Sequence, residues 1–353
     1  MIDFNVFHGK RVLVTGHTGF KGSWLVAILE RAGATVKGLS LAPLEGSHFE
    51  QLGFPGTHGG DAYCDIRDFS KVSSLIHAFD PEIIFHLAAQ PLVRESFLST
   101  RDTFEVNFMG GVNILESVRT SSSLRAFVFI TSDKAYENVE WEWGYRENDR
   151  LGGVDPYSAS KGAAEIAVSS YSRSILHEQP FELATARAGN VIGGGDWAKD
   201  RIVPDIVRAI RAKQPVVIRN PRSTRPWQHV LEPLSGYLLL AQRMLEGEIE
   251  IQDSYNFGPD LSETRTVSDV AEGLINLHGT GSIELVGDAQ GLHEASLLQL
   301  NCDRAKHGLG WYPRWTFEET LEKTGEWYKK QSDGVTAASL TNGQISDYFK
   351  ELT

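Results

Sequence analysis

The stretch Arg11-Val-Leu-Val-Thr-Gly-His-Thr-Gly-Phe-Lys-Gly22 decides the fold of this chain. Residues 11–15 are a short apolar run of the kind that a buried parallel strand requires. Glycines follow at positions 16, 19 and 22, and a helical pattern of apolar residues begins at Ser23. Strand, glycine turn and helix start are the context of a dinucleotide-binding fingerprint, because the turn lets a pyrophosphate approach the helix N-terminus. The spacing Gly-x-x-Gly-x-x-Gly departs from the commoner form, and the order Lys21-Gly22-Ser23 excludes a P-loop.

The end of the next strand indicates which dinucleotide to expect. A strand over residues 35–40 should end near the adenosine ribose, where an acidic residue is usual. Here the chain reads Gly38-Leu39-Ser40, with no acidic residue and no arginine to hold a 2′-phosphate. We therefore expect NAD as the cofactor rather than NADP. The residues expected to contact NAD follow four predicted strands or lie in the helix at 157–176: Gly16, His17, Thr18, Gly19, Phe20, Lys21, Gly22, Ser40, Asp65, Ile66, Leu87, Ala88, Ala89, Tyr157 and Lys161.

A second signal is the pair Tyr157 and Lys161, in the segment Tyr-Ser-Ala-Ser-Lys. On a helix this spacing places both side chains on one face. A neighbouring ammonium favours the phenolate, so we expect the pKa of Tyr157 to fall towards neutrality. Such a phenolate can take a proton from an alcohol while a hydride leaves the same carbon. The alternative interpretation of the spacing alone is an ordinary amphipathic helix.

Composition and patterning predict one large α/β fold. With 353 residues and 41% apolar composition, the chain can bury a substantial core and form two lobes. Apolar runs alternate with helical patterns over the first half, which is typical of α/β architecture. We predict a Rossmann-type doubly wound parallel sheet with a smaller C-terminal α+β substrate-binding lobe. The predicted domains are 1–187, carrying the cofactor site and the Tyr/Lys pair, and 188–353, with segments that return to the first.

The charge, the cysteines and the histidines of the chain argue against several classes of function. The net charge of −12 and the lack of a basic tract argue against nucleic acid or an anionic membrane as partner. No apolar stretch approaches a membrane span and no signal peptide is visible. The two cysteines, Cys64 and Cys302, are interpreted as reduced and structural in a cytoplasmic protein. The eleven histidines form no His-Glu-x-x-His motif or Cys/His cluster, so we predict no metal.

Polar residues follow several of the predicted strands. Thr131-Ser-Asp-Lys134 comes directly after an apolar run at 125–130, where open α/β sheets place their chemistry. Asn107 lies in a predicted helix over 101–120 and is interpreted as a polar bridge between backbone segments. Residues 188–197 are expected to form a flexible, polar loop. Arginines then concentrate in an acidic chain, and their planar forks suit phosphate oxygens: Arg201, Arg219, Arg222 and Arg225.

Together these motifs resemble the extended short-chain dehydrogenase/reductase family, in its nucleotide-sugar-modifying branch. The resemblance covers nearly the whole chain. The glycine and Tyr/Lys motifs are general to the family, whereas His17, Lys21 and the pair Asp133-Lys134 are more specific. The stretches that carry the resemblance are 14–24, 86–94, 130–134, 187–190, 195–197, 225–230 and 256–259.

The resemblance implies a redox-neutral 4,6-dehydration of a nucleotide sugar with tightly held NAD, and CDP-glucose is the implied substrate. Tyr157 would deprotonate the C4 hydroxyl, Lys161 would hold the ribose hydroxyls and lower the pKa of Tyr157, and Ser132 would hydrogen-bond the C4 oxygen. Loss of water across C5 and C6 needs a base and an acid, and Asp133 is the expected acid. Arg225, Arg201 and Asn190 are expected at the pyrophosphate. Weaker candidates for the pyrophosphate are Arg187, Arg219 and Arg222.

The identity of the C5 base stays open at this stage. Related dTDP-glucose dehydratases carry Asp-Glu where this chain has Asp133-Lys134. A free lysine has a pKa of about 10.4, so a neutral Lys134 at pH 7 needs a pKa lowered by about 3. A partly dry site and Lys161 favour that change, whereas Asp133 opposes it. Either Lys134 is the base, or it stays charged and stabilises an enolate while water takes the proton.

Three alternatives compete with this interpretation. A nucleotide-sugar 4-epimerase or 4-reductase needs the Tyr/Lys pair but no acid/base pair, so Asp133-Lys134 argues against both. A dehydratase acting on a dTDP, UDP or GDP sugar would share all of the motifs. A catalytically silent NAD-binding regulator should have lost Tyr157 or Lys161, and both are present. A homodimer or homotetramer, formed through the helices at 101–120 and 157–176, is a family-level expectation.

Overall fold

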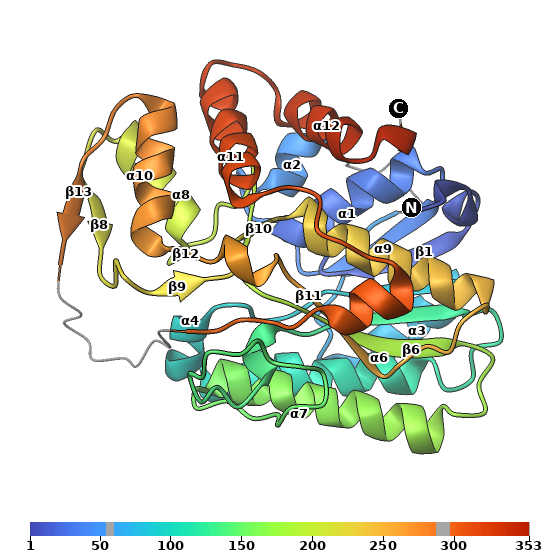
Figure 1. Cartoon of the computed structure of the whole chain (residues 1–353). Helices are drawn as coiled ribbons and strands as arrows, with labels where there is room; N and C mark the ends of the chain where they lie inside the picture. The colour runs from blue at the N-terminus through green and yellow to red at the C-terminus, as the bar shows by residue number, and fades with distance from the viewer. Residues whose placement is uncertain (54–59, 287–296, 353) are drawn as a thin grey trace.

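A parallel sheet of seven strands forms the centre of the molecule in the computed structural model, which describes residues 1–53, 60–286 and 297–352. The strand order is β11-β6-β5-β4-β1-β2-β3, so the sheet is wound outward from β1 in both directions (Figure 1). This confirms the predicted doubly wound fold. The strands, in sheet order, are β11 (Ser254–Phe257), β6 (Glu182–Ala188), β5 (Ala126–Ile130), β4 (Ile83–His86), β1 (Arg11–Thr15), β2 (Thr35–Ser40) and β3 (Ala62–Tyr63).

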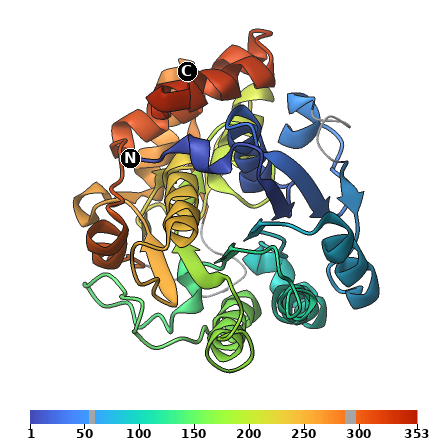
Figure 2. The same cartoon turned by 90° about the vertical axis from the view of Figure 1, so that its right-hand side faces the viewer.

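Alternation along each strand divides the core between the two faces of the sheet. Val12 and Val14 belong to one buried cluster and Leu13 to the other, as the two-residue period of a strand requires. Helices cover both faces, which is why the strands are apolar throughout (Figure 2). On one face lie α1 (Phe20–Arg31) and α9 (Leu231–Glu246), and on the other α3 (Phe69–Phe79), α6 (Gly111–Ser117) and α7 (Pro156–Ser170).

The helix expected over 101–120 is built from three pieces. α5 (Thr100–Phe104) continues into a π-helical stretch, Glu105–Gly110, and then into α6. Asn107 lies in the π-helical stretch, and its amide bonds both the N–H and the carbonyl of Gln90, at 2.8 and 3.0 Å. It also donates to the Ser160 hydroxyl at 3.0 Å. Asn107 is therefore the polar bridge that the sequence predicted.

A smaller unit lies beside the sheet and contains α8 (Ile202–Arg211), β8 (Val216–Ile218), α10 (Val267–His278) and β13 (Ile283–Leu285). Strands β8 and β13 pair in parallel, and α8 and α10 pack together. Between these segments the chain returns to the large sheet through α9 and β11. The short strands that join the two parts are β7 (Val191–Ile192), β9 (Thr224–Arg225), β10 (Gln228–His229) and β12 (Arg265–Thr266). The short helix α4 (Val93–Leu98) follows β4 and packs against α5 and α7.

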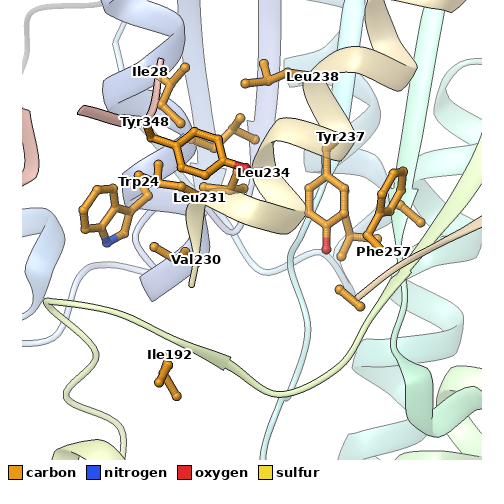
Figure 3. Packing of buried hydrophobic residues seen from close by; sticks show 14 of the residues in the cluster. Trp24, Ile28, Ile192, Val230, Leu231, Leu234, Tyr237, Leu238, Phe257 and Tyr348 are labelled. Carbon is orange, nitrogen blue, oxygen red and sulfur yellow. The ribbon is translucent and has the colours of Figure 1, made fainter. Parts of the chain in front are cut away.

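Two C-terminal helices, α11 (Phe317–Ser332) and α12 (Ala337–Tyr348), pack against α2 (His48–Leu52) and α1 (Figure 1). Tyr348 of α12 lies over α9 near Leu231, with Trp24 of α1 close by (Figure 3). The C-terminal helix α12 therefore packs on α1, the helix that follows the glycine turn. Within the described ranges, none of the helices is long and apolar enough to span a bilayer.

The loop at 188–197 differs from the flexible, polar segment that its composition suggested. Val191 and Ile192 pair in parallel with β10, and residues 192–196 are buried. A Cβ on Gly194 would lie 2.0 Å from the indole of Trp327, so the backbone here packs directly on an aromatic ring. The glycines provide close approach rather than mobility, because their missing side chains leave room for that ring.

Candidate active site

The glycine turn packs against the end of strand β4. Gly16 has φ of +72°, and a Cβ there would lie 2.7 Å from the backbone nitrogen of Ala88. A Cβ on Gly22 would lie 2.2 Å from the carbonyl oxygen of Gly16, so helix α1 can approach the turn only with glycine at this position. The structure thus places Gly16 beside Ala88, two of the residues expected to hold NAD.

The other side of the turn meets the end of β2. The hydroxyls of Thr18 and Ser40 are 2.9 Å apart, which joins two further predicted cofactor residues. The ring of His17 is buried against Gly38, whose Cβ would lie 2.3 Å from it. His17 Nε2 lies 3.1 Å from an oxygen of Asp61, and burial lowers the pKa of His17 although Asp61 opposes this. His17 therefore occupies space over the strand end where an acidic residue is usual.

The remaining predicted cofactor residues line the same edge of the sheet. Asp65 follows β3 and is bound by the guanidinium of Arg67, with a shortest distance of 2.7 Å. These hydrogen bonds hold the pKa of Asp65 below its usual value. Ile66 is buried, and Gly110 packs against its side chain. Leu87 and Ala89 are half-buried after β4.

One residue, Thr131, separates β5 from Ser132, which begins a 3₁₀ turn over Asp133–Ala135 that includes Lys134. The Ser132 hydroxyl caps this turn: it accepts from the Lys134 N–H at 3.2 Å and donates to Asp133 Oδ1 at 2.9 Å. Asp133 is buried, and its Oδ2 has no hydrogen-bond partner among the described residues. Burial raises the pKa of Asp133, with the Lys134 charge opposing it.

Tyr157 and Lys161 lie one turn apart near the start of α7. Asp155 caps this helix by accepting from the Ser158 N–H at 2.9 Å, and Pro156 takes the first helical position. Both Tyr157 and Lys161 are buried. The helix packs on the 3₁₀ turn, so the structure brings the predicted base next to Ser132 and Asp133.

The pKa of Tyr157 does not fall towards neutrality as the sequence suggested. Burial raises the pKa of Tyr157 to about 12, and the hydrogen bond with Ser132 offsets only part of that rise. Burial, with help from the nearby charge of Lys21, lowers the pKa of Lys161 to about 7. Lys161 therefore loses much of its own charge near neutral pH and favours the phenolate less than a fully charged ammonium would.

Two further cations, Lys21 and Arg201, lie close to the centre of the site, which is formed by Ser132, Asp133, Tyr157 and Lys161. Lys21 extends from the glycine turn, and its Nζ lies 5.9 Å from the centroid of the Tyr237 ring. Burial lowers the pKa of Lys21 to about 8, and the charge of Arg201 adds to the effect. Arg201 itself is held by Asp196, with Nη1 3.0 Å from Oδ2. The Arg201 charge also favours ionisation of Tyr157, so the arginine lies within electrostatic range of the predicted base.

Arg187 does not serve the pyrophosphate. It is buried and fully engaged by Glu165, with Nε–Oε1 of 2.8 Å and Nη2–Oε2 of 2.7 Å. Its Nη1 donates to the Tyr136 hydroxyl at 2.6 Å and to the Glu147 carbonyl at 3.0 Å. These bonds use the guanidinium donors that a phosphate would need, so we correct the expectation and remove Arg187 from the substrate-binding candidates.

The other candidate arginines differ in the exposure of their side chains. Arg225 is buried next to the centre, and its charge lowers the pKa of Asp133. Asn190 precedes β7, and its carbonyl accepts from the Gln228 N–H at 3.1 Å. Arg219 and Arg222 are exposed side chains in the smaller unit. Of the predicted pyrophosphate ligands, Arg201 and Arg225 are the arginines that lie at the centre.

Sequence reasoning missed three side chains that build this site. Glu165 lies four residues after Lys161, so the same helical spacing could have revealed it. Asp196 lies five residues before the arginine that it holds. Tyr237 left no motif: its hydroxyl is buried on α9 (Figure 3), and no partner for it occurs among the described residues.

The site has the donors and cations that a dinucleotide requires. A glycine turn at a helix N-terminus suits a pyrophosphate, and Lys21, whose pKa is about 8, adds positive charge near neutral pH. Asp133 Oδ2 and the Tyr237 hydroxyl are buried atoms for which the described residues provide no hydrogen bond. Such atoms need polar partners, which a bound cofactor or substrate can supply.

Fold and site together define a short-chain dehydrogenase/reductase of the extended type, in the branch that modifies nucleotide sugars. Within it, the chain belongs to the GDP-mannose 4,6-dehydratase family, whose model matches residues 13–324. It is 47% identical to the CDP-glucose 4,6-dehydratase of Salmonella typhimurium over 362 aligned positions that cover 100% of both chains.

Solved structures share the fold. The Mth375 epimerase of Methanothermobacter thermautotrophicus superposes with a TM-score of 0.79 at 24% identity, covering 94% of this chain and 95% of that one. The dTDP-glucose 4,6-dehydratase of Bacillus anthracis, solved in complex with NAD, gives 0.77 at 21% identity, covering 92% and 98%. At these identities the comparison supports the architecture, and the chemistry has to be argued from the site.

Proposed function

We propose that this protein is an NAD-dependent CDP-glucose 4,6-dehydratase, which converts CDP-D-glucose to CDP-4-keto-6-deoxy-D-glucose. The observation that carries the proposal is the meeting of Ser132, Asp133, Lys134, Tyr157 and Lys161 at one buried centre. An epimerase has no use for the Asp133-Lys134 pair. The identity of 47% to the Salmonella dehydratase over its full length supports the choice of nucleotide. A 4-keto-6-deoxy sugar would serve as a precursor of deoxysugars.

Bound NAD would supply the acceptor for the C4 hydride of the sugar and the donor that gives this hydride back to C6. The residues that would hold it are those of the glycine turn, Thr18 with Ser40, and Lys161. Tyr157 takes the proton of the C4 hydroxyl, and Ser132 holds the C4 oxygen. Because the pKa of Tyr157 is raised to about 12 by burial, the base becomes effective only when bound ligands add positive charge or hydrogen bonds beside it.

Asp133 is suited to be the acid that protonates the leaving C6 hydroxyl. Burial raises its pKa, so a larger fraction carries a proton at neutral pH than for an exposed carboxyl. Lys134 is less buried than its neighbours and sits one residue from this acid. We assign it the second of the two roles left open: its charge stabilises the enolate that forms when water takes the C5 proton.

The segment 188–353 supplies most of the substrate-binding surface in this proposal. Arg201, Arg225 and Asn190 bind the pyrophosphate, and Asp196 keeps Arg201 pointed at the centre. A planar guanidinium can donate two parallel hydrogen bonds to phosphate oxygens, which fixes the nucleotide relative to the reacting sugar.

The proposal includes a cytoplasmic location and a homo-oligomer. Cys64 and Cys302 are both free and buried, as expected for reduced, structural cysteines. Exposed apolar side chains on the helices at 101–120 and 157–176, Met109 and Ile166 among them, support a dimer formed through these helices. Light scattering of the purified protein tests this part, and a monomer at all concentrations would remove it.

The deciding experiment uses CDP-glucose deuterated at C4, with products analysed by mass spectrometry and NMR. Loss of one water with deuterium at C6 is the expected result. A product of unchanged mass would indicate an epimerase. Turnover of a UDP, dTDP or GDP hexose with no turnover of CDP-glucose would leave the chemistry standing and overturn the nucleotide assignment.

A further inference from the structure

We propose that His48 is a positioning residue, which holds the first turn of helix α1 for the cofactor and the loop at 193–196 for the substrate. It does so through a buried chain of hydrogen bonds that ends in the C-terminal helices. The inference rests on the proposed function only in taking NAD and a CDP-sugar as the two ligands.

The chain of hydrogen bonds joins four helices. His48 Nδ1 lies 2.7 Å from the Ser23 hydroxyl on α1, and Nε2 lies 2.9 Å from the Thr341 hydroxyl on α12. Thr341 in turn accepts from Trp327 Nε1 on α11 at 3.3 Å. At its other end, the Ser23 hydroxyl donates to the carbonyl of Phe20 at 2.9 Å.

The direction of the chain follows from its two ends. The single hydroxyl proton of Ser23 goes to Phe20, so Nδ1 of His48 must donate to Ser23. Nε2 is then the acceptor for the hydroxyl of Thr341. Burial lowers the pKa of His48 to about 3, so the ring stays neutral and keeps one acceptor nitrogen at working pH. Each member therefore donates to the next, from Trp327 through to Phe20.

The chain acts on the part of α1 that faces the cofactor. Phe20 is the first residue of α1, and Ser23 also bonds the Gly19 carbonyl through its N–H, at 2.9 Å. The opposite side of this turn is fixed by the contact of Gly22 with Gly16. The turn is thus held from two sides, and the N–H groups at its start are the ones that a pyrophosphate meets.

The same histidine contacts the loop that leads to Arg201. A Cβ on Gly195 would lie 2.2 Å from Cδ2 of His48, so the backbone there lies on the imidazole. Trp24 stacks on His48 with ring centroids 5.5 Å apart, and its indole N–H donates to the Gly194 carbonyl at 3.0 Å. Next along the loop is Asp196, which holds Arg201.

Thr341 offers a matched pair of variants for the test, because it lies in the C-terminal helix α12 and touches neither ligand in this arrangement. Thr341→Val removes the hydroxyl and keeps the shape, whereas Thr341→Ser keeps the hydroxyl. We expect Thr341→Val to raise the Kd for NAD, measured by tryptophan fluorescence without sugar, by about threefold to tenfold, the size of one hydrogen bond. The Kd for CDP, measured by calorimetry, should rise as well, and Thr341→Ser should stay within about twofold of the wild type.

A second variant tests whether the members act as one chain. Ser23→Ala removes the link at the other end, and we expect a similar loss of NAD affinity. The double variant should lose less than the product of the two single effects, because either change already breaks the chain. Circular dichroism confirms that each variant is folded before binding is measured.

Two results would overturn the proposal: folded Thr341→Val that binds NAD as tightly as the wild type, or a double variant whose loss equals the full product. Wild-type turnover of CDP-glucose is measured in parallel. If wild-type protein binds NAD and fails to turn over the sugar, the proposed function falls while the role of His48 is still tested by the NAD titrations.

Discussion

Glu165 of α7 and Arg187 of β6 form a buried ion pair with two parallel hydrogen bonds, of 2.8 and 2.7 Å. The carboxylate also accepts from the hydroxyls of Thr131 and Thr185, the latter at 2.7 Å. Thr131 directly precedes Ser132, and Glu165 follows Lys161 by one turn. The pair therefore joins the helix that carries the base to the strand end that carries the acid.

Breaking this pair should destabilise the fold strongly. Glu165→Gln leaves the Arg187 guanidinium charged and buried without its counter-ion, which costs roughly 3–5 kcal/mol of unfolding free energy. The matched control is Glu326→Gln, which breaks an exposed i,i+4 pair in which Lys330 Nζ lies 2.8 Å from Glu326 Oε2. That control should cost under about 0.5 kcal/mol. Urea denaturation measures the unfolding free energy of both variants. Equal losses in the two would show that burial of the Glu165–Arg187 pair does not increase its contribution to stability.

Tyr157→Phe should lower kcat for CDP-glucose by about 10²–10⁴-fold, the usual contribution of a positioned general base. The ring remains, so the Kd for NAD should change little, and the two measurements together separate chemistry from binding. Ser170→Ala is a control on the same helix, because Ser170 is exposed at the C-terminal end of α7. A variant Tyr157→Phe with near-normal kcat would show that another group takes the C4 proton.

The two roles considered for Lys134 predict different behaviour. If its charge stabilises the enolate, Lys134→Arg keeps a positive group and should retain a substantial part of the activity. Lys134→Met removes the charge, and we expect kcat to fall at least about 100-fold. Steady-state assays of both variants give the answer. An arginine variant as inactive as the methionine variant would favour Lys134 as the C5 base instead.

Substrate binding should depend on the arginine that Asp196 holds. Arg201→Gln removes charge-assisted hydrogen bonds to the pyrophosphate, worth roughly 1.5–3 kcal/mol, and KM for CDP-glucose should rise about 10- to 100-fold. Arg222→Gln is the control, because Arg222 is exposed. Its KM should stay within about twofold of the wild type at moderate salt. Similar KM values for the two variants would remove Arg201 from the pyrophosphate site.

The lowered pKa of Lys161 gives the ligand-free protein a defined pH dependence. Its pKa is about 7 in the folded protein, against 10.5 ordinarily, so the unfolded chain binds more protons between these values. The contribution of Lys161 to stability therefore improves as pH rises through this window. Lys161→Met should be more stable than the wild type at pH 7, and the difference should shrink by about 2 kcal/mol at pH 9. Urea denaturation at both pH values checks this, and a constant difference would contradict the lowered pKa.

The sequence alone determined the features that depend on local patterns. The run at 11–15 with glycines 16, 19 and 22 specified a strand, a tight turn and a helix start, because only that conformation suits those residues in order. The spacing of Tyr157 and Lys161 fixed their common helical face. The position of Thr131-Ser-Asp-Lys134 after an apolar strand placed polar groups at the carboxyl edge of the sheet. The family resemblance rests on these same local motifs.

Tertiary structure decided what depends on groups distant in sequence. The pKa of Tyr157 is set by burial, which its neighbours on the helix do not reveal. Arg187 binds Glu165 and Tyr136 instead of the substrate, and these partners lie beside it only because β6 and α7 pack together. The loop at 188–197 is fixed by Trp327, more than a hundred residues further along the chain. Burial and partner choice are properties of the packed fold, and a local pattern cannot report them.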